Sequence, residues 1–134
     1  MESVSVPSGT MWHQITVESD HLRVELFGRQ TARETQEFLN ALEDYGIKHR
    51  QPRVLISVRC SKPVFTVEKY GIVEYFDRAS RYSAKIALLG DSDELRIAHQ
   101  YIESLARQRG VNVRAFRDEA GALGWLRTTE QVTS

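Results

Sequence analysis

The chain has 134 residues, among them 18 basic and 18 acidic side chains and one cysteine, and its formal net charge is zero. This length has room for one domain that buries roughly two thirds of its unfolded surface, so a single domain is expected. The balanced charge lacks the cationic excess with which proteins neutralise nucleic-acid phosphates, and this excludes nucleic acid as the expected partner.

The beginning of the chain predicts a tail followed by a hairpin. Serine is frequent in residues 1–10, and Pro7 and Gly9 interrupt them, which predicts a disordered N-terminal tail. From Met11 onward, apolar and polar residues alternate on both sides of the polar turn 18–21. Such alternation indicates an antiparallel hairpin with one face toward solvent.

The next segment predicts an amphipathic helix. Thr31 and Glu34 have the spacing at which each side chain caps the other's backbone N–H group. Apolar residues then follow at helical spacing, namely Phe38, Leu39, Leu42 and Tyr45. Gly46 predicts the C-terminal end of this helix, because glycine adopts the left-handed conformation without steric cost.

The middle of the chain contains an almost uninterrupted apolar run over residues 54–58. A run of this kind is typical of a central strand that helices cover on both faces. A second helix is predicted at about 66–81, and residues 85–90 predict another buried strand.

The last part of the chain predicts two helices separated by a strand. Asp91 and Glu94 have the spacing of a second capping box, and the helix after them carries an apolar stripe. The stripe consists of Leu95, Ala98, Ile102, Leu105 and Ala106. A final strand is expected over about 111–116, and Asp118 is expected to begin a short helix.

The order of these elements is β-β-α-β-α-β-α-β-α, which predicts an α/β domain. Strands separated by helices favour right-handed crossovers and therefore a largely parallel sheet. The expected sheet is mixed and five-stranded with about four helices. Its first strand is expected to be antiparallel, at or near an edge.

Cysteine content and hydropathy predict a location. Cys60 has no second cysteine with which to form an internal disulfide, so a reducing cytoplasm is expected. No stretch approaches the roughly 20 apolar residues of a membrane span, and the N-terminus shows no basic region followed by an apolar one.

Several short segments together carry a resemblance to a known family. They are the strand 54–58 leading into an amphipathic helix, the strand end at 86–91, and residues 113–116 followed by Ala122, Trp125 and Leu126. With the element order, they resemble the SpoIIAA-like branch of the STAS superfamily over residues 11–127. Residues 1–10 and 128–134 are then disordered tails. The resemblance implies a STAS-like fold without metal or cofactor, a protein partner, and association with membranes or apolar ligands.

The same resemblance directs attention to phosphorylation. In the anti-sigma-factor antagonists of this superfamily, phosphorylation of a serine at the start of the second helix switches binding to a kinase. The family has an Asp-Ser-Ser-Gly-like tetrad there, and this chain has Phe-Thr-Val-Glu at residues 65–68. Thr66 and Ser61 are the phosphoacceptor candidates, since a phosphate would gain from a helix N-terminus and from Lys62. The alternative role for Thr66 is a structural N-cap.

The second helix has more apolar residues than one core contact needs. One stripe can face the core, made of Phe65, Ile72, Phe76 and Ala79. The other apolar residues fall on the remaining faces, namely Val67, Tyr70, Val73 and Tyr75. If they cover a protein partner or a second subunit, the chain is an interaction module. If the helix stands slightly away from the sheet, they line a pocket for an apolar small molecule.

Two cations extend this predicted binding surface. Arg59 and Lys62 flank the second helix next to Phe65, and they suit an anionic lipid head or the head of an acidic amphiphile. The primary prediction is therefore a binding and regulatory module that engages a protein partner, a second copy or a membrane surface. The alternative is a carrier or sensor of an apolar or amphiphilic molecule, held between the second helix and the sheet.

An enzyme is the least favoured class. Catalysis through Cys60, or a metal at Asp91, Asp93 and Glu94, would need a base or further ligands that the sequence does not identify. Cys60 is instead expected to be a small buried side chain. The four histidines have no triad or metal spacing, and His99 is expected at the core boundary. No catalytic residue, metal or cofactor is predicted.

Overall fold

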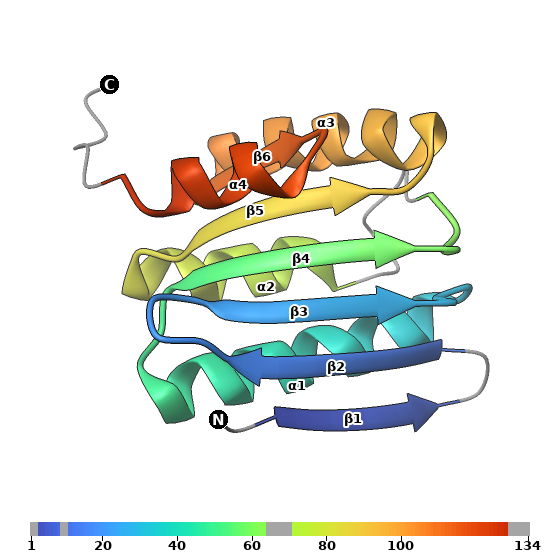
Figure 1. Ribbon diagram of the computed structural model, residues 1–134, viewed down its shortest axis with the longest axis horizontal. Coiled ribbons are helices and arrows are strands. Elements are labelled where there is room, and N and C mark those ends of the chain that lie inside the picture. Colours follow the sequence, from blue (N-terminus) through green and yellow to red (C-terminus); the bar gives the residue numbers. More distant parts are fainter. Residues whose placement is uncertain (1–2, 9–10, 64–70, 129–134) are drawn as a thin grey trace.

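The computed structural model of the chain describes residues 3–8, 11–63 and 71–128, and it shows one sheet with helices on both faces (Figure 1). The strands are β1 (Ser3–Ser8), β2 (Met11–Val17), β3 (Leu22–Phe27), β4 (Arg53–Arg59), β5 (Lys85–Gly90) and β6 (Asn112–Phe116). The helices are α1 (Ala32–His49), α2 (Ile72–Ala79), α3 (Asp93–Gln108) and α4 (Glu119–Leu126), with a 3₁₀ turn η1 (Ser80–Tyr82) after α2.

The six strands lie side by side in chain order. β1, β2 and β3 are antiparallel neighbours, and β3 to β6 are parallel. Helices α1, α2 and α3 lie on one face of the sheet, and α4 lies on the other (Figure 1). The predicted α/β class and mixed sheet are confirmed. The carboxyl ends of the four parallel strands therefore meet at one edge of the sheet.

The strand β1 was not predicted, because residues 1–10 were expected to be a disordered tail. Residues Ser3–Ser8 instead pair with β2, with Ser5 opposite Gln14 and Pro7 opposite Trp12. An edge strand can form through backbone hydrogen bonds on one side only, and such a strand tolerates proline. The sheet consequently has six strands where five were expected, and the first predicted strand is second from the edge.

The ends of α1 confirm one prediction and correct another. Thr31 and Glu34 form the expected capping box at its N-terminus. Gly46, however, lies inside the helix, which continues to His49 and ends at Arg50 with a φ of 51°. The Arg50 N–H group donates to the carbonyls of Gly46 and Ile47, so this last turn is closed without glycine in the left-handed position.

Two further helix boundaries differ from the predictions. The helix predicted at 66–81 is described from Ile72, and it gives way to the 3₁₀ turn after Ala79. For α3 the cap is Ser92 rather than Asp91, since the Ser92 hydroxyl accepts from the Leu95 N–H group. Asp118 caps α4 as predicted, accepting from the Gly121 N–H group.

Both faces of the central strands are buried. On one face, a large apolar cluster joins the sheet to α1, α2 and α3, with Ile15, Val24, Ile56 and Phe76 among its members. On the other face, Leu55 and Ala87 pack against Ala122 and Leu126 of α4. The prediction that helices cover residues 54–58 from both sides is therefore confirmed, and the larger cluster contains the candidate site.

Candidate functional site

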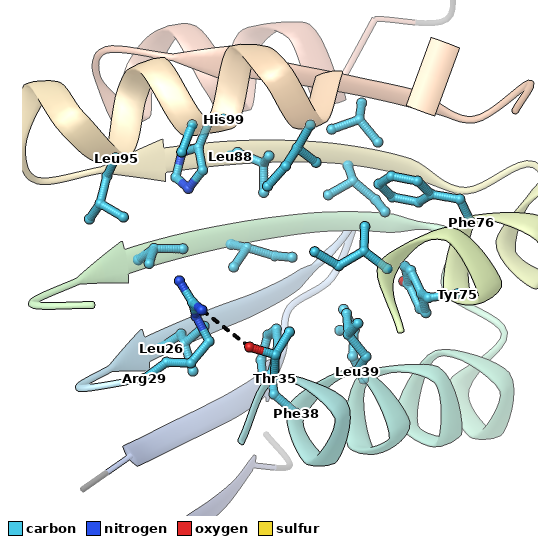
Figure 2. Close-up of a pocket in the computed structure, with 18 residues that line it drawn as sticks. Leu26, Arg29, Thr35, Phe38, Leu39, Tyr75, Phe76, Leu88, Leu95 and His99 are labelled. Carbon is cyan, nitrogen blue, oxygen red and sulfur yellow. Dashed lines mark hydrogen bonds between the residues drawn. The ribbon is translucent and has the colours of Figure 1, made fainter. Parts of the chain in front are cut away.

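A cavity of about 90 Å³ lies between the sheet and helices α1, α2 and α3 (Figure 2). Most of its wall is apolar. The sheet contributes Leu26, Val58 and Leu88, and the helices contribute Phe38, Leu39, Ile72 and Phe76 among others. Polar groups gather at one end, where Arg29, Thr35 and His99 line the wall (Figure 2). The cavity thus combines a long apolar surface with a polar end near the carboxyl ends of the parallel strands.

Backbone contacts position Arg29 at that end. The strand β3 ends at Phe27, and Gly28 turns the chain with a φ of 74°. The Arg29 N–H group then donates to the Ser61 Oγ at 3.1 Å, and the Lys62 N–H group donates to the Arg29 carbonyl at 2.8 Å. These bonds join the segment after β3 to the segment after β4, and they hold the Arg29 backbone beside the cavity.

The side chain of Arg29 is buried and has a fixed direction. Only 6% of the residue is exposed. Its Nη1 donates to the Thr35 Oγ1 at 3.1 Å, which Figure 2 shows as a dashed line, and its Nη2 donates to the Lys62 carbonyl. Thr35 in turn donates to the Thr31 carbonyl in the first turn of α1. The guanidinium is therefore held in the cavity wall by contacts with two separate segments.

His99 approaches the same end of the cavity from α3 (Figure 2). It was expected at the core boundary, but only 5% of it is exposed, so that prediction is wrong. Burial, and then the positive charge of Arg29, lowers the pKa of His99 from 6.5 to about 4. The imidazole is consequently neutral at pH 7 and offers one donor and one acceptor nitrogen.

The apolar part of the cavity corrects the prediction for Tyr75. This residue was expected on an outer face of the second helix, yet only 3% of it is exposed and its side chain lines the cavity. Val73, also expected outside, is half-buried and packs against the core. Ile72, Phe76 and Ala79 are buried as predicted. The side of α2 that meets the sheet is therefore wider than the predicted stripe.

The other predicted site residues have separate locations. Ser61 is half-buried, and its hydroxyl accepts from Arg29 and donates to the Arg59 carbonyl at 3.0 Å. Lys62 is exposed beside the polar end of the cavity. Arg59 follows Val58 in the strand and therefore points to the opposite sheet face, where it forms an ion pair with Glu25. The predictions for Phe65, Thr66, Val67 and Tyr70 lie outside the described residues.

Cys60 differs from its predicted state. It is exposed rather than buried, and it has a φ of 50° at the turn after β4. Its N–H group donates to the Asp91 Oδ2 at 3.1 Å, which ties this turn to the carboxyl end of β5. Across residues 3–8, 11–63 and 71–128, no three histidine, cysteine or acidic side chains gather as metal ligands would.

Sequence reasoning did not single out Arg29 and did not assign His99 to a site. One signal could have found them. In open parallel sheets, ligands bind beyond the carboxyl ends of the strands. Arg29 follows the end of β3, and His99 lies on the helix that follows β5. Arg29 and His99 come close to each other because of the way α3 packs on the sheet. No short motif in the sequence indicates this packing.

Comparison with known protein families and with curated proteins finds no match to this chain. In the part of the chain that the structure describes, no helix is both long and apolar enough to span a bilayer.

Proposed function

We propose that the protein binds a small apolar or amphiphilic molecule, without covalent chemistry, in the cavity between the sheet and helices α1 to α3. Such a protein acts as a carrier or a sensor. The observation that supports this proposal is the cavity itself, which is apolar along most of its wall and polar at one end. Ligand sites commonly combine an apolar lining with a few polar groups that orient the ligand.

The size of the cavity argues against a simple packing defect. Protein cores contain few voids larger than a water molecule. The space of about 90 Å³ between the sheet and the helices is larger than such a void. A ligand that fills it would bury apolar surface of the cavity wall, so binding accounts for a space that core packing alone does not favour.

Binding of a protein partner or a membrane through α2 has less support. That prediction depended on apolar side chains turned away from the core, and Tyr75 is buried. Val73 is half-buried against the core. From β2 onward the order of elements is the one that a STAS-like domain was expected to have, which supports our further proposal of a distant relation to that superfamily.

A titration with a neutral probe tests the proposed function. We expect hexan-1-ol, added to the ¹⁵N-labelled full chain at pH 7, to produce saturable shifts in the amide signals of cavity residues such as Val58, Ile72 and Leu88. Mass spectrometry under native and then denaturing conditions would show in addition whether the purified protein retains a non-covalent ligand. Absence of both saturable shifts and a retained ligand would contradict the proposal.

A cavity-filling variant supplies the matched control. Ala98 lines the cavity on α3, so Ala98→Leu places extra carbon atoms in the empty space. We expect this variant to fold and to lose hexan-1-ol binding. The replacement Ala120→Leu, at an exposed position of α4, adds the same atoms outside the cavity and should leave binding unchanged. Equal effects of the two replacements would place the binding site elsewhere.

A further inference from the structure

The two outer edges of the sheet differ in how they are protected. An edge strand presents unpaired backbone N–H and C=O groups, and proteins commonly cover such an edge or place charged side chains on it. The strand β6 has both kinds of protection. The Ala115 N–H group donates to the Glu103 Oε1 of α3 at 2.8 Å, and the exposed Arg114 carries a charge in the middle of the strand. This edge is therefore protected against pairing with a further strand.

The strand β1 forms the opposite edge and has no charged residue (Figure 1). Among the strands that the structure describes, β2 is the only neighbour of β1. The other side of the β1 backbone therefore has no described strand with which to pair. An uncharged edge of this kind is a template for pairing with another chain.

The free backbone groups of β1 can be identified from the pairing of the inner strands. The Gly28 N–H group donates to the Arg59 carbonyl of β4, so the preceding carbonyl, that of Phe27, points to β2. There it forms a hydrogen-bonded pair with Trp12, which lies directly opposite. Successive residues of a strand direct their backbone groups to opposite sides. The backbone groups of the next residue, His13, consequently point to β1.

In β1, this alternation leaves the backbone groups of every second residue free. Val6 lies opposite His13 and bonds to it, so its neighbours Ser5 and Pro7 point their backbone groups away from β2, as does Ser3. Pro7 has no N–H group, which agrees with its place on the outer side of an edge strand. The outer edge of β1 thus presents the N–H groups of Ser3 and Ser5 and the carbonyls of all three residues.

We infer that β1 pairs with β1 of a second copy of this chain, antiparallel and with Ser5 opposite Ser5 at a two-fold axis. In this register each Ser5 N–H group donates to the Ser5 carbonyl of the other copy. Each Ser3 N–H group donates to the Pro7 carbonyl of the other copy. Both outward N–H groups of the strand then have an acceptor, and Pro7 lies where its carbonyl is needed.

A second copy suits this edge better than a flexible peptide does. Its β1 is already held in an extended conformation by β2, so pairing loses less entropy than the ordering of a flexible segment would. No like charges meet, because Ser3–Ser8 contains no charged residue. The protected β6 edge prevents further growth of the sheet, so the assembly closes as a two-fold dimer.

The contact is small, so its test needs high protein concentrations. One pair of short strands buries less than the roughly 1,200 Å² of a standard interface, as weak and transient complexes do. In sedimentation equilibrium of the full chain, we expect the mass to rise from that of one chain toward that of two between about 10 µM and about 1 mM. A mass that stays at one chain over this range would overturn the proposal.

A cross-linking experiment tests the register. All its variants carry Cys60→Ser, which removes the exposed native thiol. In the proposed dimer the α-carbons of the two Ser5 residues lie about 5.5 Å apart. The two Ser3 residues are roughly 14 Å apart along the strands. Dibromobimane, a short reagent that bridges two thiols, should therefore link Ser5→Cys chains into dimers and leave Ser3→Cys chains largely unlinked. Equal yields for the two variants would contradict this register.

A proline at residue 5 removes the central hydrogen bonds of the dimer. Because the Ser5 N–H group points away from β2, Ser5→Pro leaves the pairing of Val6 with His13 in place, which nuclear Overhauser effects between them can verify. We expect this variant to sediment as one chain. The control Ser5→Ala also lacks the hydroxyl but keeps the N–H group, and it should dimerise like the wild type. Dimers of Ser5→Pro, or their absence in Ser5→Ala, would show that the β1 backbone is not the contact.

Discussion

His99 packs directly over Gly90, the last residue of β5. A β-carbon at Gly90 would lie 3.2 Å from the His99 Cε1 and 2.8 Å from the Leu95 Cβ. The α3 helix can approach the carboxyl end of β5 this closely because residue 90 has no side chain. The polar end of the cavity therefore depends on a glycine that lies beside it.

This contact predicts that Gly90→Ala destabilises the protein. The nearest atom is the Leu95 Cβ, which is attached to the backbone, so α3 itself must move. We expect the free energy of unfolding to fall by about 1–3 kcal/mol, measured by urea denaturation. The control is Gly124→Ala in α4, where an added β-carbon meets nothing within 4 Å. That change should be neutral or stabilise by up to about 1 kcal/mol. Equal effects of the two changes would contradict the tight contact.

The lowered pKa of His99 predicts a loss of stability in acid. As the pH falls below 6.5, the unfolded chain binds a proton that the folded protein accepts only near pH 4. The free energy of unfolding is therefore not reduced by His99 above about pH 7. Below that pH, protonation of His99 in the unfolded chain lowers this free energy progressively down to pH 4. The decrease amounts to about 3 kcal/mol over this window at ~1.4 kcal/mol per pH unit.

The variant His99→Met removes this titration. Denaturation at several pH values should show that its free energy of unfolding falls less steeply between pH 6.5 and 4 than that of the wild type. Some acid sensitivity should remain, because burial also lowers the pKa of His13. If the free energy of unfolding changed with pH in the same way for variant and wild type, the pKa of His99 in the folded protein would equal its value in the unfolded chain.

His13 predicts a substitution that stabilises the protein. This residue is buried in β2 at an edge-to-face contact with Phe38, and neither ring nitrogen has a hydrogen-bond partner among the described residues. An unsatisfied buried polar group costs about 1–3 kcal/mol. His13→Leu should therefore raise the free energy of unfolding at pH 7 by about 1 kcal/mol. His13→Gln keeps a polar side chain at the site and should give no gain. A gain with Gln as large as that with Leu would contradict this account.

Tyr75 predicts a large effect on stability. Because its side chain is buried in the cavity wall, Tyr75→Ala should lower the free energy of unfolding by about 3 kcal/mol. The neighbouring Glu74 is exposed, and Glu74→Ala should change stability by less than about 0.5 kcal/mol. Thermal unfolding of the two variants measures the difference. Similar melting temperatures would place Tyr75 at the surface, as the sequence alone suggested.

The predictable parts of the fold are those that local patterns encode. Alternation at Ile15 and Val24 indicated strands with one buried face, and both residues are buried on that face. The spacing of Thr31 and Glu34 indicated a capping box, which is present. The strand β1 was not predicted, because its pairing with β2 makes it a strand and its own composition does not indicate one.

The candidate site was less predictable than the fold. The sequence suggested a pocket under the second helix as an alternative, and residues of α2 do line the cavity. Tyr75 was placed on the wrong side, because an apolar residue on a helix does not reveal how far the helix rotates toward the sheet. Arg29 resembled any other loop cation, since no neighbouring residue in the chain indicates its burial.

By itself, then, the sequence determined the α/β class, most elements and their order, because hydrophobic periodicity and helix caps act over a few residues. Only the tertiary structure decided that Arg29 and His99 face one cavity. They are brought together by the parallel packing of β3, β4 and β5 and by the close approach of α3 at Gly90. Burial and the charge of Arg29, which together lower the pKa of His99, arise from contacts between segments that are distant along the chain.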